Sequence, residues 1–230
     1  MSLASPKTDD QGGALVRAAK SPASSMLPTA LETLAWCVID GTAIFLDLGS
    51  DRYFRLPDVQ NRDFVTSVCL PALSSPCQPA SLPLPPSWIP PVRQSAAVQD
   101  GPFHVGNVAR ALWVQRRVER RLARNPLSAI LHDLRSTITS RCDRDQSDST
   151  KVAGDIRAFQ QARLLRSAAD RCLPRSIALA LCLASHRCRA HVVLGVKLAP
   201  FAAHCWTQLR DEVLNDEVEE VLRYQPILIV

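Results

Sequence analysis

The sequence predicts an α+β fold. Strand-like segments separated by turn residues occur before residue 57 and after residue 190, whereas apolar residues at three- and four-residue spacing dominate residues 107–185. A helix that leads into a short antiparallel sheet, as near the C-terminus, is typical of this class. The chain of 230 residues suffices for one large domain or two small ones. Because hydrophobic residues make up 47% of the chain but aromatic residues only 5%, aliphatic side chains must form most of the core.

The N-terminal residues 1–27 are small and polar, so we expect a flexible tail. They lack the apolar block of a secretory signal, and the chain holds no run of about 18 apolar residues that could cross a membrane. We therefore expect a cytoplasmic protein without a membrane span, whose eight cysteines are reduced thiols. The net charge of +5 is too small to indicate a nucleic-acid partner.

Residues 28–70 have the pattern of a β-hairpin or meander followed by a helix. The Asp40-Gly41 pair is a hairpin signal, and a second turn is expected at residues 48–51. Between these turns, apolar residues alternate as on a half-buried strand. The next segment, residues 58–70, is expected to be a helix with Asp58 near its N-cap.

The middle of the chain is predicted to pass from an extended connector into helices. Nine of the 17 prolines lie within residues 71–102, which excludes a long helix or a central strand there. We expect this connector to pack through Trp88 and Ile89. Three helices should follow, over 107–125 with Asn107 as N-cap, from Pro126 onward, and over 152–169, with a polar loop at 140–150.

The last part of the chain combines a helix with strands. Residues 172–185, CLPRSIALALCLAS, form an apolar helix in which Pro174 is tolerated because it lies in the first turn. Four strand-like segments follow, rich in β-branched residues and separated by turn signals. They are AHVVLGVKL, AAHCWTQLR, EVLND and PILIV.

Cys172 is a candidate nucleophile because it lies at the predicted start of this helix. The helix dipole and the free backbone N–H groups there favour a thiolate. The same N–H groups could hold an oxyanion during acyl transfer. The alternative for Cys172 is a buried core cysteine, which is the commoner role of this residue in an apolar helix.

A thiolate nucleophile needs a general base, and His204 is the candidate, on a predicted strand with Trp206 on the same face. Asp216 ends the next predicted strand, and neighbouring antiparallel strands would bring the two side by side. The carboxylate would then orient the imidazole, as in other catalytic triads. The alternative for His204 is a polar strand residue without a catalytic role.

Two further clusters have both a functional and a structural explanation. Four N and S ligands within ten residues could bind zinc, although their spacing matches no common zinc finger. They are Cys182, His186, Cys188 and His191. The other explanation is a core cysteine followed by a polar helix end. The helix 107–125 carries six arginines, which could bind nucleic acid or an acidic partner, or simply face solvent.

The stretch 172–216 resembles the transglutaminase-like leader peptidases of lasso peptide biosynthesis, the lasso B proteins. The shared features are the Cys-Leu helix start with Ser176, then AHVVLGV followed by PF, then H-x-W, then LND. The residue after the histidine, Cys205, departs from the family, which usually has a small residue there.

The resemblance implies a transglutaminase- or papain-like cysteine peptidase domain over residues 105–230. In this domain Cys172 would be the nucleophile, His204 the base and Asp216 the orienting acid. No metal or other cofactor bound by this chain is implied.

Residues 40–58, DGTAIFLDLGSDRYFRLPD, are similar to the peptide-recognition element of such enzymes, a winged-helix-like unit of three strands and three helices. The resemblance implies this element over 28–75, or to 100, and a proline-rich connector over 76–104. A leader peptide would add to an exposed sheet edge by β-augmentation. The expected edge strand holds the peptide-binding residues Arg52, Tyr53, Phe54, Arg55 and Leu56, with Tyr53 and Phe54 near the pocket.

The function that the resemblance implies is removal of the leader from a ribosomal lasso precursor peptide. The implied partner is an asparagine-synthetase-like macrolactam cyclase, which would bring an ATP requirement. Two alternatives stay open at this point. The chain could be a catalytically inactive scaffold that delivers the precursor peptide, or it could transfer the acyl group to an amine instead of water.

Overall fold

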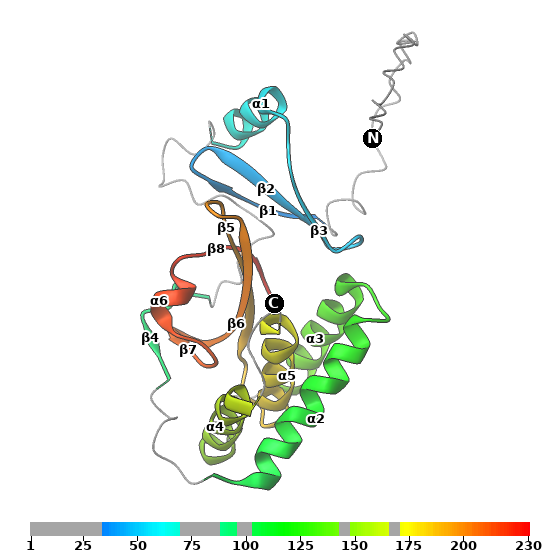
Figure 1. Ribbon diagram of the computed structural model, residues 1–230, viewed down its shortest axis with the longest axis vertical. Coiled ribbons are helices and arrows are strands. Elements are labelled where there is room, and N and C mark those ends of the chain that lie inside the picture. The colour runs from blue at the N-terminus through cyan, green and yellow to red at the C-terminus, as the bar shows by residue number, and fades with distance from the viewer. Residues whose placement is uncertain (1–33, 70–87, 96–102, 143–147, 166–170) are drawn as a thin grey trace, which may run out of the picture.

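The structure, a computed structural model, describes residues 34–69, 88–95, 103–142, 148–165 and 171–230. From one end of the molecule to the other lie helix α1, a three-stranded sheet, a five-stranded sheet and a layer of helices (Figure 1). The strands are β1 (Leu34–Ile39), β2 (Thr42–Asp47), β3 (Arg52–Arg55), β4 (Arg93–Gln94), β5 (His191–Lys197), β6 (Ala202–Leu209), β7 (Glu212–Val213) and β8 (Gln225–Ile229). The helices are α1 (Asp58–Cys69), α2 (Val105–Leu122), α3 (Leu127–Arg141), α4 (Ser149–Leu165), α5 (Cys172–Ser185) and α6 (Val218–Val221). The predicted α+β class is confirmed.

The N-terminal sheet is antiparallel with the order β1-β2-β3, so β3 lies at its edge. Asp40 and Gly41 make the first turn with φ values of 47° and 74°, the left-handed conformations that a two-residue hairpin favours. The predicted turn at 48–51 is also present, and α1 begins at Asp58 as the sequence pattern indicated.

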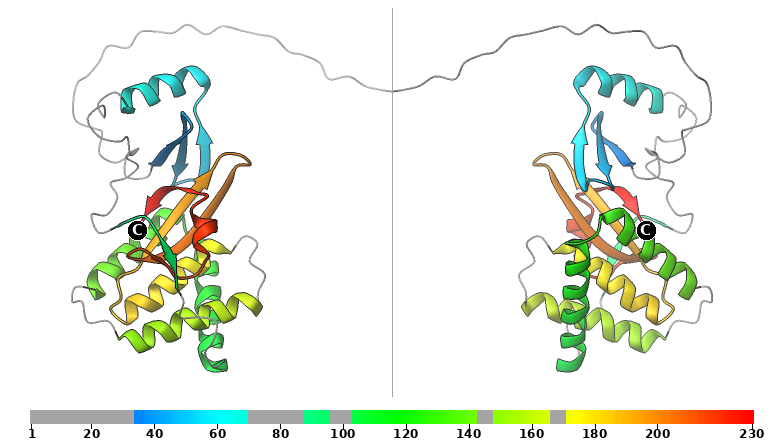
Figure 2. Two further views of the ribbon diagram at one scale, coloured as in Figure 1. Left: turned by 90° about the vertical axis from the view of Figure 1, so that its left-hand side faces the viewer. Right: turned by 90° about the vertical axis from the view of Figure 1, so that its right-hand side faces the viewer.

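The two faces of this small sheet have different neighbours. On one face, four aromatic rings pack with neighbouring centroids 5.1 Å apart and attach α1 to the sheet: Trp36, Phe45, Phe54 and Phe64. On the other face, four buried side chains belong to the same hydrophobic core as helices α2 to α5: Ala35, Cys37, Ile44 and Leu46. The small sheet therefore packs directly on the C-terminal part, and Figure 2 shows the β5–β6 hairpin reaching up beside it.

Polar contacts also join the turn after β2 to the start of α3. The N–H of Ser128 donates to the carbonyl oxygen of Leu48 at 3.2 Å, and the N–H of Leu127 donates to Oδ1 of Asp51 at 3.1 Å. The first N–H groups of a helix have no acceptor within the helix. The N-terminal sheet supplies acceptors for α3, which orients the sheet on the C-terminal part.

The five-stranded sheet has the order β4-β7-β6-β5-β8 and is antiparallel except for the parallel pair β4–β7. The edge strand β4 belongs to the proline-rich connector, in agreement with the tolerance of prolines at sheet edges. Trp88 packs against a small core that contains Trp206, as predicted for the connector. Ile89 is 48% exposed and instead contributes its carbonyl oxygen, which accepts a hydrogen bond from Gln208.

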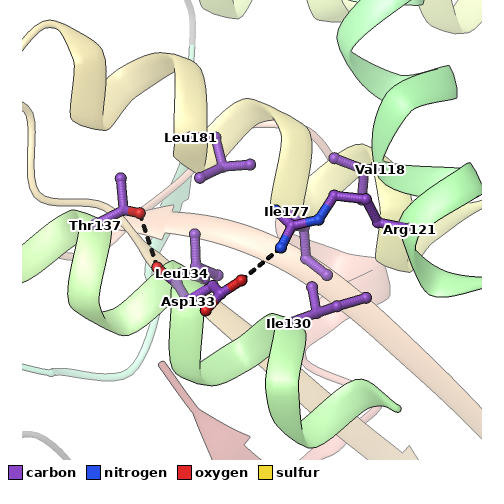
Figure 3. Close-up of a pocket in the computed structure, with 8 residues that line it drawn as sticks. All are labelled: Val118, Arg121, Ile130, Asp133, Leu134, Thr137, Ile177 and Leu181. Atoms are coloured by element: carbon purple, nitrogen blue, oxygen red, sulfur yellow. Dashed lines mark hydrogen bonds and ion pairs between the residues drawn. The ribbon is translucent and has the colours of Figure 1, made fainter. Parts of the chain in front are cut away.

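Helix α5 is enclosed by the five-stranded sheet on one side and by α2, α3 and α4 on the other (Figure 1). The cavity between α2, α3 and α5 measures only about 20 Å³, room for about one water molecule. Arg121 of α2 pairs with Asp133 of α3 beside it (Figure 3). This close packing holds the position of α5 and, with it, the position of its first residue.

Several predicted boundaries are wrong. Helix α2 begins at Val105 with His104 at its N-cap, so Asn107 lies inside the first turn. Helix α4 begins at Ser149 rather than at residue 152. The strand predicted over EVLND, residues 212–216, is shorter than expected, because β7 ends at Val213.

Some expectations concern residues outside the described ones. They are the tail 1–27, much of the connector 76–104, part of the loop 140–150 and the end of the helix predicted over 152–169. Of the three helices implied for the recognition element, α1 lies within the described residues. Over the same described ranges, no helix has both the length and the apolar character needed to cross a membrane. The six cysteines whose side chains are described are free thiols.

Candidate active site

Cys172 is the first residue of α5 and lines an open cavity of about 470 Å³. The sequence starts the helix there because Pro174, which lacks an N–H group, is placed in the first turn. The thiol is half-buried, and its sulfur accepts hydrogen bonds from the backbone N–H groups of Leu173 and Cys205. The predicted position at a helix N-terminus is therefore the observed one.

His204 and Asp216 lie beside Cys172. His204 is on β6, its Nε2 is 2.7 Å from Oδ2 of Asp216, and its ring also hydrogen-bonds the Cys172 side chain. The imidazole thus connects the thiol to the carboxylate. The structure brings together the three residues that the sequence singled out.

Asp216 is not on a strand, contrary to the prediction. It lies in the bend after β7, because the backbone pairing along β6 stops there. The N–H of Leu214 still donates to the carbonyl of Thr207 at 2.9 Å, but the N–H of Thr207 donates to the side-chain Oδ1 of Asn215 at 2.8 Å. Asn215 replaces a backbone acceptor, and the chain turns so that the next side chain reaches His204.

The three groups shift one another toward a thiolate–imidazolium pair. Burial alone raises the pKa of the Cys172 thiol, but the hydrogen bond and charge of His204, with two backbone N–H groups, outweigh it and lower this pKa below its usual value. Burial lowers the pKa of His204, but hydrogen bonds to Asp216 and Cys172 outweigh it and raise this pKa to about 9. Burial opposes ionisation of Asp216, yet His204 and Arg163 hold its pKa below the usual range.

Helix α4 supports the bend that carries Asp216. Nη1 of Arg163 lies 3.6 Å from Oδ1 of Asp216, the oxygen that does not face His204. One turn earlier on α4, Nε2 of Gln160 donates to the carbonyl oxygen of Leu214 at 2.7 Å. The carboxylate is therefore held between an imidazole and a guanidinium.

A buried polar network connects the elements that carry the three residues. The hydroxyl of Ser176, one turn after Cys172, donates to the carbonyl oxygen of Cys205 at 3.1 Å and accepts from Nδ2 of Asn215 at 2.9 Å. Oγ1 of Thr207 donates to the carbonyl oxygen of Ser176 at 3.1 Å. These bonds join α5, β6 and the bend after β7, so they set the spacing between the sulfur, the imidazole and the carboxylate.

Aromatic rings enclose the imidazole. The centroid of the His204 ring is 6.3 Å from that of Trp206 and 5.1 Å from that of Tyr224. Gly195 lies opposite His204 on β5, and a Cβ built on it would come within 2.9 Å of Trp206 and Tyr224 side-chain atoms. The missing side chain at Gly195 therefore allows both rings to pack beside the imidazole, and the nearer Tyr224 ring favours its cationic form.

The cavity beside Cys172 has walls from both parts of the molecule. Leu46, Asp51 and Tyr53 of the N-terminal sheet and its turn line it, together with residues of α2, α3, α5, β5 and β6. The ring of Tyr53 packs against Phe201, in the turn between β5 and β6, with centroids 5.6 Å apart. The small sheet is thus part of the candidate active site.

Of the five residues predicted to bind peptide, one lines the cavity and the other four do not. On β3, the half-buried Tyr53 lines the cavity, whereas Phe54 points to the opposite face and stacks on Phe45. Arg52 and Arg55 are exposed, and Leu56 follows the end of the strand. Of the two aromatic residues expected near the pocket, only Tyr53 lines it.

The potential zinc ligands do not come together in this structure. Within the described residues, no group of three or more His, Cys, Asp or Glu side chains is arranged to hold a metal ion. His186 instead lies 3.1 Å from Asp155, and burial raises the pKa of the Cys182 thiol to about 11. The core-cysteine explanation of this segment agrees with that geometry.

Several supporting residues have no signal in the sequence pattern. Arg163, Gln160 and Tyr224 reach the site through tertiary packing from α4 and from the turn before β8. Ser176 and Asn215 lie within the motifs quoted above, CLPRS and LND, but spacing alone does not reveal that they bond each other. In the sequence, the one indication of their role is that they lie close to candidate catalytic residues.

The arrangement has the parts needed for nucleophilic acyl chemistry. An accessible sulfur is paired with an imidazole that a carboxylate orients, and backbone N–H groups surround the sulfur at a helix N-terminus. Arrangements of this kind form a thioester with an acyl group and pass that group to water or to an amine.

Comparison with known proteins gives one family. No curated protein and no solved structure matches the chain. The model of the transglutaminase-like superfamily matches residues 109–229, which run from α2 to the end of β8 and include the candidate catalytic residues. The superfamily contains cysteine proteases and transferases. Because the match covers more than half of the chain, this protein belongs to the transglutaminase-like superfamily.

Proposed function

We propose that this protein is a cysteine peptidase that removes the leader from a lasso precursor peptide. The observation that carries this proposal is the hydrogen-bonded chain of Cys172, His204 and Asp216 beside an open cavity. The sequence motifs shared with lasso leader peptidases supply the substrate. The site chemistry by itself supports cysteine peptidases and acyltransferases in general.

The proposed reaction begins with the thiolate–imidazolium pair. The sulfur of Cys172 attacks the scissile carbonyl carbon, and the N–H groups at the start of α5 stabilise the resulting oxyanion. His204 donates its proton to the leaving amine, and a thioester forms with Cys172. His204 then takes a proton from a water molecule, the hydroxide attacks the thioester, and the thiolate is released. Asp216 keeps the imidazole oriented in both steps.

The leader is proposed to bind along the edge of β3, by β-augmentation. This strand pairs with β2 on one side, and its Arg52 and Arg55 are exposed. Because Tyr53 on the same strand lines the catalytic cavity, a peptide on this edge lies close to Cys172. The recognition element over 28–75, the connector over 76–104 and the peptidase domain from residue 105 remain the proposed division of the chain.

The released core peptide would pass to an asparagine-synthetase-like cyclase, which closes the macrolactam with ATP. This chain is proposed to need no bound cofactor for the cleavage step, because thiolate, imidazole and carboxylate complete the proton transfers.

The test is mass spectrometry of a lasso precursor incubated with the full chain and with its Cys172→Ala variant. We expect two fragments whose summed mass exceeds that of the precursor by one water, and no cleavage by the variant, which should still bind the precursor. Cleavage retained in the variant would refute the assignment. An intact precursor with the unaltered chain favours the scaffold alternative, and a product joined to an amine favours acyl transfer.

A further inference from the structure

The walls of the cavity beside Cys172 have a clear chemical character. Eight lining residues are apolar or aromatic and come from seven elements: Leu46, Tyr53, Leu122, Leu127, Leu173, Pro174, Leu194 and Ala203. The charged side chains among the described lining residues, apart from His204, are the carboxylates of Asp51 and Glu119. The volume of about 470 Å³ is within the range of sites that enclose small ligands or side chains.

Tyr53 has a defined place in this wall. It is half-buried, its ring packs against Phe201 of the β5–β6 turn, and burial raises its pKa above the usual value, so the phenol stays neutral. The strand that carries it is held by pairing with β2 and by the hydrogen bond from Leu127 to Asp51. Tyr53 is therefore a preorganised wall rather than a mobile surface residue.

We propose that this cavity binds an apolar side chain on the acyl side of the scissile bond, and that Tyr53 of the N-terminal sheet sets the size of the side chain. The small sheet then has a role in specificity at the reacting centre, distinct from any binding of a remote leader. Burial against these apolar walls stabilises a bound apolar side chain. An acidic side chain would instead lose its hydration and be repelled by the carboxylates of Asp51 and Glu119. The inference rests on the proposed function for the identity of the nucleophile only.

The test uses peptidyl acyloxymethyl ketones, which alkylate a thiolate without any need for hydrolysis. Two probe series carry a variable residue, either at the ketone or one position before it, as Gly, Leu, Phe or Asp. The second-order rate of Cys172 labelling is followed by intact mass. In one of the two series, the probe with Leu should label Cys172 about tenfold or more faster than the probe with Gly, and about 100-fold faster than the probe with Asp.

Two variants then test the wall. Tyr53→Ala should shift the preference from Leu toward Phe by about tenfold, whereas the matched Tyr53→Phe, which keeps the ring, should keep the original preference. Because Tyr53→Ala could destabilise the small sheet, Ala203→Leu provides a second route. It narrows the cavity from β6, where Ala203 is exposed, and should lower labelling by Phe more than labelling by Gly.

The outcomes separate this inference from the proposed function. If no probe labels Cys172 in the unaltered chain, the nucleophile assignment fails. If the probes of both series label Cys172 at similar rates whatever their side chain, the inference alone is overturned. It is also overturned if Tyr53→Ala and Ala203→Leu, both shown by circular dichroism to be folded, leave the preference unchanged.

Discussion

The two ends of helix α5 carry the same three residue types in different arrangements. At its N-terminal end, Cys172 is grouped with the His204–Asp216 pair, and near its C-terminal end, Cys182 lies near the His186–Asp155 pair. The two His–Asp pairs are almost equally accessible, with side-chain exposures of 17% and 11% for the first and 17% and 10% for the second. Both aspartates also pair with an arginine.

The sulfur atoms distinguish the two sets. Cys172 begins the helix, lines a cavity and hydrogen-bonds an imidazole, and its pKa is lowered. Cys182 is 5% exposed, burial and the charge of Asp155 raise its pKa to about 11, and Arg110 is its hydrogen-bond partner. Residue composition therefore does not define a reactive site. Position at the helix end, access and the hydrogen-bond partner of the sulfur do.

The largest expected difference is between the two cysteine substitutions. Cys172→Ala should abolish cleavage and labelling, because the variant lacks the sulfur that forms the thioester. Cys182→Ala should keep both and lower the free energy of unfolding by about 1 kcal/mol, as expected for a small loss of core packing. Peptide cleavage and thermal unfolding measure the two effects. Equal loss of cleavage in the two variants would remove the distinction between the ends of α5.

The two aspartates should differ nearly as much. Asp216→Asn removes the charge that stabilises the imidazolium and should lower kcat, by up to about 10⁴-fold on the precedent of other triads. Asp155→Asn should leave kcat unchanged and reduce stability by about 1–3 kcal/mol through its bonds to Arg110 and His186. The kcat and the urea midpoint of each variant check this. A catalytic defect in Asp155→Asn would show that the second set also acts in the reaction.

The pH profile of kcat/KM should be bell-shaped and determined by Cys172 and His204, and the set at the other end of α5 should not contribute to it. As pH falls, kcat/KM should be lost when Cys172 is protonated, at a pH below the usual pKa of a thiol. As pH rises, it should be lost near pH 9, when His204 loses the proton that it gives to the leaving amine. Iodoacetamide should accordingly alkylate Cys172 at neutral pH while Cys182 stays unmodified. An alkaline limb near pH 6.5 would mean that Asp216 does not hold the imidazolium.

The sequence predicted the local part of this arrangement and missed the tertiary part. The bounds of α5 followed from apolar spacing and from Pro174, and the shared face of His204 and Trp206 followed from strand alternation. The position of Asp216 was wrong because EVLND continues a strand pattern, and only the side chain of Asn215 reveals where pairing stops.

The N-terminal sheet illustrates the same limit. A hairpin or meander with both turns was predicted from turn residues and alternation, and the resemblance implied the third, edge strand. The contact of Tyr53 with the catalytic cavity, however, depends on packing between segments more than a hundred residues apart. Periodicity describes one element at a time. It says which face of a strand is apolar, but not which distant element covers that face.

The smallest expected effect concerns the arginines of the two sets. Arg163 withdraws part of the charge of Asp216 from His204, so Arg163→Gln should raise the pKa of His204 and move the alkaline limb upward. The other charged or titratable groups near the pair, Cys172, Lys197 and Tyr224, stay in place. Because Arg163 is partly exposed, the expected shift is about 0.2–0.7 pH units, and Arg163→Lys should restore the original limb. Arg110→Gln at the other end of α5 should leave the pH profile unchanged. A downward shift of the alkaline limb in Arg163→Gln would contradict this explanation. It would mean that Arg163 holds the Asp216 carboxylate against His204, because the imidazolium would lose its partner when the arginine is removed.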